Sequence, residues 1–94
     1  MQPLTQALPG ALAALLRETP LSAGKVNFAW RAAVGSAVER VTSVRLEDRI
    51  LIVEPVDAIW AREITRSSPV ILMRLQTLLG QDTVTKIQIR TPRS

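Results

Sequence analysis

The side chains of this sequence that could do chemistry are mainly arginines, because the chain contains no histidine and no cysteine. Histidine is the usual general base, metal ligand and near-neutral switch, and cysteine supplies nucleophiles, thiolate ligands and disulfides. Their absence argues against most hydrolytic, metal-dependent and redox mechanisms. We therefore expect a protein that is not an enzyme and that needs no cofactor, metal or small-molecule substrate.

Two pairs of adjacent polar residues fit structural roles better than chemical ones. Glu47 and Asp48 stand between two apolar runs, where neighbouring carboxylates are typical of a turn, and no further metal ligand follows nearby. Ser67 and Ser68 have no histidine partner and no nucleophile-elbow pattern around them. None of the four residues is expected to be catalytic.

Basic residues are the best candidates for a binding site. Lysine and arginine number 12 against 8 acidic residues, which gives a net charge of +4 and favours an anionic partner. Arg62 and Arg66 are one helical turn apart, and Lys86 and Arg90 share the polar face of the last expected strand. These four residues are the predicted contacts to nucleic acid or a protein partner. The alternative is an ordinary solvated face balanced by neighbouring carboxylates.

The elements that position these residues are most strongly patterned in residues 49–80. Four aliphatic residues at 50–53 predict a strand that is apolar on both faces and is therefore central in its sheet. Asp57 can cap the helix that follows, and Gly80 can end it. Pro69, after two serines, predicts either a kink or two abutting helices over residues 58–66 and 69–79.

The remaining elements complete an α+β fold. The sequence predicts a helix over residues 9–17, a second over 22–34 capped by Ser22 and ended by Gly35, and a short helical turn over 36–40. Strands are expected over 41–46, 50–54 and 83–90, with a turn over 47–49. The order helix, helix, strand, strand, helix, strand predicts a three-stranded sheet covered on one face by helices. We expect one domain over residues 1–94, with a core over 22–90, an N-terminal helical extension over 1–21 and a flexible end over 91–94.

Four residues are the expected anchors of the core: Trp30, Trp60, Ile52 and Leu75. A tryptophan on the apolar face of an amphipathic helix usually packs inside the protein. The alternative for either tryptophan is stacking on a base or anchoring a partner, because tryptophan is enriched at binding hot spots.

An ordered set of short motifs resembles the DciA-like family. The set consists of FAWRAAVG at residues 28–35, ILIVEPV at 50–56, IWARE at 59–63, LQTLLG at 75–80 and VTKIQIR at 84–90. No single motif is specific, and their order carries the resemblance. It implies a small bacterial protein that binds the replicative DNA helicase and assists its loading on single-stranded DNA.

The resemblance also implies a fold similar to the KH domain, and the expected element order agrees with it. The glycines, at positions 10, 24, 35 and 80, never form the Gly-x-x-G loop with which KH domains grip nucleic acid. Many family members carry a basic tail, whereas four residues follow Arg90 here. We therefore expect the globular domain, or a separate partner, to make any helicase contact, and we expect single-stranded DNA to be bound weakly.

Two other functions stay open at this point. A KH-like fold could bind RNA, and a small sheet with a leucine-rich N-terminal helix could be a structural interaction domain without nucleic-acid affinity. No apolar stretch reaches membrane-spanning length, and no segment has the pattern of a secretion signal. We expect no membrane partner and a cytoplasmic location.

Overall fold

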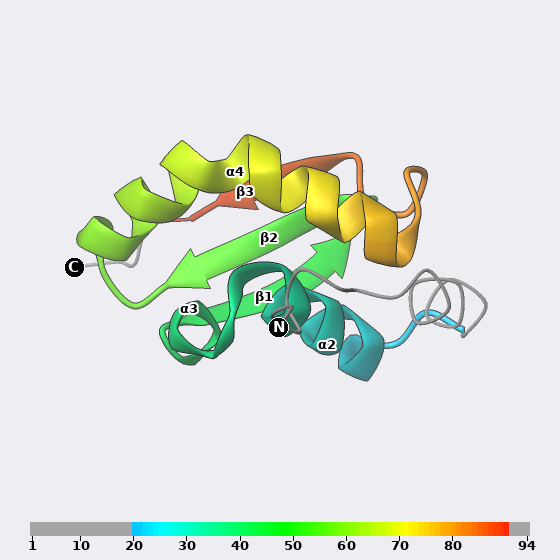
Figure 1. Cartoon of the computed structure of the whole chain (residues 1–94), viewed down its shortest axis with the longest axis horizontal. Helices are drawn as coiled ribbons and strands as arrows, with labels where there is room; N and C mark the ends of the chain where they lie inside the picture. The colour runs from blue at the N-terminus through cyan, green and yellow to red at the C-terminus, as the bar shows by residue number, and fades with distance from the viewer. Residues whose placement is uncertain (1–19, 91–94) are drawn as a thin grey trace, which may run out of the picture.

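The computed structural model describes residues 20–90, which form three helices and a three-stranded sheet (Figure 1). In chain order these are α2 (Ala23–Val34), α3 (Ser36–Arg40), β1 (Thr42–Glu47), β2 (Ile50–Pro55), α4 (Ala58–Leu79) and β3 (Lys86–Ile89). This order confirms the predicted α+β architecture. The helix expected over residues 9–17 lies outside the described residues.

Both ends of α2 follow the local chemistry that the sequence predicts. The Ser22 hydroxyl accepts a hydrogen bond from the amide of Lys25 at 3.1 Å, which satisfies one free donor of the first turn. Gly35 ends the helix with a φ of 89°, a conformation that favours glycine, and its amide donates to the Arg31 carbonyl at 2.8 Å. The chain then turns directly into α3.

β1 and β2 form a tight hairpin. Glu47 pairs with Ile50, so the turn consists of Asp48 and Arg49, with φ values of 55° and 67°. Positive φ at both central residues is the geometry that matches the right-handed twist of a hairpin. The predicted turn over residues 47–49 is thus confirmed, with Glu47 already part of the strand.

β2 is the central strand, as its two apolar faces predicted. It pairs antiparallel with β1 and parallel with β3, and α4 makes the crossover between β2 and β3. Figure 1 shows α4 in front of β3 and α2 with α3 in front of β1, with β2 visible between them. The helices therefore cover one face of the sheet.

The core lies between this helical layer and the sheet. The largest side chains that it buries completely are Trp30 of α2, Leu51 and Val53 of β2, Leu75 and Leu78 of α4, and Val84. Ile52 is also buried, with 4% of its surface exposed, but the strand alternation places it on the sheet face opposite Leu51 and Val53.

Of the two alternatives expected at Pro69, a kink or two abutting helices, the structure excludes the second, because α4 is one helix of 22 residues with Pro69 inside it. Proline has no amide hydrogen and leaves the carbonyl four residues earlier, that of Thr65, without its helical donor. The Ser68 hydroxyl donates to that carbonyl at 3.0 Å. This bond replaces the lost one, and Figure 1 shows the helix arching over the sheet.

The last strand is shorter than the sequence pattern predicted, because it begins at Lys86 and not at residue 83. Val84, which alternation had placed on the polar face, is fully buried in the connection before β3. The Gln76 side-chain amide donates to the Val84 carbonyl at 3.0 Å and holds this connection against α4. Among the described residues, no helix is long and apolar enough to cross a membrane.

Candidate partner-binding surface

The first turns of α4 carry the strongest candidate residues. The Asp57 carboxylate accepts a hydrogen bond from the Trp60 amide at 2.9 Å and so fixes where the helix begins. From this starting point, the helical repeat turns Ala61 and Ile64 toward the core, where both are buried. Arg62 and Arg66 consequently point away from the core, and both are exposed.

Arg66 is only loosely held, and Arg62 is free of ion pairs within residues 20–90. The guanidinium of Arg66 lies 3.8 Å from the Glu63 carboxylate, and both side chains are largely in solvent. An exposed pair at this separation contributes little to stability and leaves the guanidinium available to another anion. Both arginines can therefore meet a partner without breaking the fold.

Lys86 and Arg90 lie in a different layer of the molecule. Lys86 pairs with Ile50, and the Arg90 amide donates to the Val53 carbonyl at 2.9 Å, so the ladder extends one residue past β3. Because Ile87 and Ile89 face the core, alternation places Lys86 and Arg90 on the sheet face opposite α2, α3 and α4. The structure thus divides the four predicted residues into two pairs and does not gather them into one patch.

The sheet face opposite these helices also contains an arginine that is already neutralised. Arg45 donates hydrogen bonds to the carboxylates of Glu47, on its own strand, and Glu54, on β2, the latter at 2.9 Å. The hydrogen bond to Glu47 is the main cause that raises the pKa of Arg45. The hydrogen bond to Glu54 and the negative charges of both carboxylates act in the same direction. This face therefore offers less free positive charge than its sequence suggests.

A shallow groove of about 360 Å³ runs between α4 and the junction of α2 with α3. Ala33, Val34 and Val38 form one wall, and Trp60 and Val70 belong to the other. The small side chains opposite Trp60 leave this indole half-buried, which corrects its expected place in the core. Its N–H finds no acceptor within the described part of the chain, so Trp60 presents both an apolar ring and a free donor.

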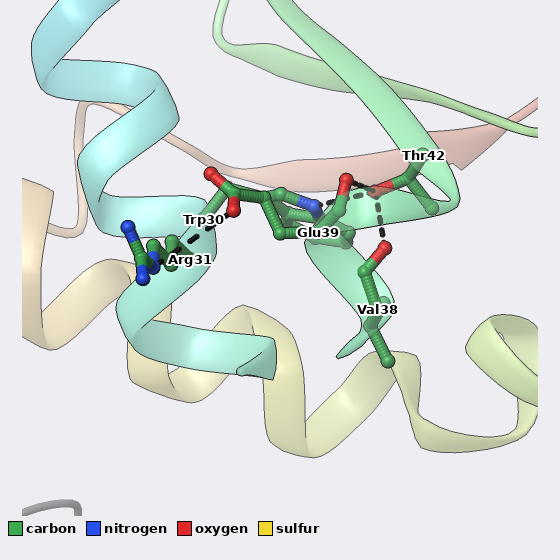
Figure 2. Close-up of polar contacts among 5 residues, drawn as sticks. All are labelled: Trp30, Arg31, Val38, Glu39 and Thr42. Atoms are coloured by element: carbon green, nitrogen blue, oxygen red, sulfur yellow. Dashed lines mark hydrogen bonds and ion pairs between the residues drawn. The ribbon is translucent and has the colours of Figure 1, made fainter. Parts of the chain in front are cut away.

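Trp30, in contrast, is fixed inside the protein (Figure 2). It is 1% exposed, and its indole Nε1 donates to the Thr42 hydroxyl at 2.8 Å. That hydroxyl donates in turn to the Val38 carbonyl at 2.8 Å, and the Arg31 guanidinium lies 3.8 Å from the Glu39 carboxylate. These contacts join α2, α3 and β1, and they leave Trp30 no surface for stacking on a base.

Sequence reasoning missed three apolar residues on the outer side of α4: Ile59, Val70 and Met73, which are 72%, 49% and 64% exposed. A signal was available, because a helix that covers one face of a sheet needs only one apolar stripe. Apolar residues at 59, 70 and 73 fall outside the stripe of Ala61, Ile64 and Leu75.

Comparison with known proteins identifies the family. The family model described as "Dna[CI] antecedent, DciA" matches residues 3–89, which include every element described above. No curated protein and no solved structure gives a significant match. Because the match covers nearly the whole chain, this protein belongs to the DciA family of replication proteins, which are associated with the replicative DNA helicase.

Proposed function

We propose that this protein binds the replicative DNA helicase directly and assists its loading on single-stranded DNA, without catalysing a reaction itself. The family match over residues 3–89 is the observation that carries the proposal. The exposed Arg62 and Arg66 on α4, and Lys86 and Arg90 on the sheet, are the proposed contacts to the helicase or to DNA.

The small number of aromatic side chains favours weak DNA binding. Proteins that hold single strands tightly combine cationic grooves with aromatic rings on which bases stack. This chain has one phenylalanine and two tryptophans, and Trp30 is buried. Phe28 and Trp60 are the aromatic residues with accessible surface, and they come from different helices. Binding must then rely on phosphate contacts, which weaken as salt rises.

Two binding measurements on the full chain test this proposal. The helicase from the same cell is immobilised, and binding of the protein is followed by biolayer interferometry. Fluorescence anisotropy then measures affinity for one labelled oligonucleotide, as single-stranded DNA and as RNA, over a salt series. We expect saturable helicase binding and weak, salt-dependent binding to DNA. Absence of helicase binding, or a clear preference for RNA, contradicts the proposal.

A further inference from the structure

The outer side of α4 has a defined pattern of side chains, here called the outer stripe: Ile59, Arg62, Arg66, Val70 and Met73. At about 100° per residue these five positions fall within about 80° around the helix axis. They face away from the buried residues Ala61, Ile64, Ile71, Leu75 and Leu78. At about 1.5 Å per residue the stripe is about 21 Å long, which corresponds to roughly four helical turns.

The composition of the outer stripe fits a protein partner better than a nucleic acid. Two aliphatic side chains and one thioether are exposed on it, and none of its residues is aromatic. Aliphatic and methionine side chains gain free energy by packing against other apolar side chains, but they offer no ring on which a base can stack. Val70 also lines the groove beside Trp60, so the apolar surface continues toward an indole with a free N–H.

The charges on the outer stripe define the partner further. Arg62 and Arg66 stand between the apolar residues, and the nearest carboxylate on α4, Glu63, makes only the 3.8 Å contact with Arg66. A guanidinium prefers a carboxylate that can receive two parallel hydrogen bonds. A matching surface therefore alternates apolar side chains with Asp or Glu.

The geometry of the outer stripe allows the partner element to be a helix. Its positions advance by 3, 4, 4 and 3 residues, and the 11 residues from Ile59 to Val70 make about three full turns. Such a line runs nearly parallel to the helix axis, so a second helix can lie along it and make contact at each turn. The apolar and acidic contact residues of that second helix would recur at the same three- and four-residue steps.

We infer that the outer stripe of α4 is the docking surface for an acidic amphipathic helix of the replicative helicase. This inference rests on the proposed function and adds the surface and the chemistry of its partner. Ile59, Val70 and Met73 pack against the apolar face of that helix, and its carboxylates pair with Arg62 and Arg66.

The test uses two double variants of the full chain and helicase from the same cell. I59S/M73S removes apolar surface, and R62E/R66E reverses the charge. All four side chains are exposed, so both variants should keep the circular dichroism spectrum and melting behaviour of the wild type. Matched controls away from the outer stripe are L21S, which removes an exposed leucine, and R40E, which reverses an exposed arginine at the end of α3.

We expect each double variant to weaken helicase binding by roughly tenfold or more, while the two controls stay within about twofold of the wild type. If the wild type binds the helicase and I59S/M73S binds equally well, the docking surface is elsewhere and the inference is overturned. The inference is also overturned if I59S/M73S changes affinity for single-stranded DNA and not for the helicase. A wild type that does not bind the helicase at all refutes the proposed function, and the inference with it.

Discussion

The indole of Trp30 donates a 2.8 Å hydrogen bond to the hydroxyl of Thr42, the first residue of β1. The donor is buried in the core, and an unpaired indole N–H there would carry a desolvation cost. Because the Thr42 hydroxyl also donates to the Val38 carbonyl, one side chain positions α2, α3 and β1 together. Val38, whose carbonyl accepts this bond, also lines the groove beside Trp60.

Replacing Thr42 by valine keeps the side-chain shape and removes the acceptor for Trp30. The Val38 carbonyl still accepts a hydrogen bond from the Val41 amide, so the main loss is the hydrogen bond of the Trp30 indole. We expect T42V to lower the free energy of unfolding by about 1–3 kcal/mol, measured by urea denaturation. T77V is the matched control, because Thr77 is exposed on α4 and its hydroxyl donates to a helical carbonyl. A T42V variant as stable as T77V would show that the indole bond is not important.

The two tryptophans should respond differently to replacement by alanine. Trp30 is fully buried, so W30A should cost about 3–5 kcal/mol and leave a domain of this size largely unfolded. Trp60 is half-buried beside an open groove, so W60A should cost distinctly less and keep a cooperative thermal transition. Circular dichroism melting of both variants makes the comparison. Equal destabilisation would mean that Trp60 belongs to the core after all.

Replacing Gly35 or Gly24 by alanine should have different effects on stability. Gly35 has a φ of 89° and a ψ of 164°, a region that is open essentially to glycine alone, so G35A should destabilise the protein by about 1–3 kcal/mol. The space around it is open, so the cost comes from the backbone conformation. Gly24 lies within α2, where alanine should be neutral or stabilise by up to about 1 kcal/mol. Denaturant titration of both variants checks the sign, and a stable G35A would contradict the assignment of Gly35 as a strained helix end.

Pro69 should limit the stability of α4. P69A restores the amide that can donate to the Thr65 carbonyl, but Ser68 already satisfies that carbonyl in the wild type. We therefore expect a gain smaller than the roughly 3 kcal/mol that separates alanine from proline in a helix interior. Thermal unfolding of P69A and of the double variant S68A/P69A measures it. A loss of stability in P69A would show that the arch of α4 is required for packing on the sheet.

Most of the fold follows from local sequence signals. Ser22 and Asp57 are N-caps, Gly35 and Gly80 end helices, and the apolar run at 50–53 gives the central strand. Each of these features depends on neighbouring residues, so periodicity and cap chemistry suffice to find it. Local patterns left two alternatives open at Pro69 and misplaced Val84, because contacts outside periodicity and cap chemistry decide both. α4 continues through Pro69 because Ser68 supplies the missing bond, and Val84 is buried by packing against α4.

The binding surface was less predictable than the fold. Charge and helical spacing identified Arg62 and Arg66, but only the packing of α4 on the sheet shows that Lys86 and Arg90 lie in another layer. The exposure of Trp60 likewise depends on the small residues across the groove, which belong to a helix 26 or more positions away in sequence, at Ala33 and Val34. The sequence pattern of one helix does not show which side chains of another helix lie opposite it.

If this protein assists the replicative helicase as proposed, a loading assay should detect its effect. Helicase from the same cell is incubated with single-stranded circular DNA, with and without the full chain, and DNA-bound helicase is separated by gel filtration and quantified. We expect more helicase on the DNA when the protein is present, and a loss of this effect with R62E/R66E. An unchanged amount of loaded helicase at saturating wild-type protein would contradict the proposal.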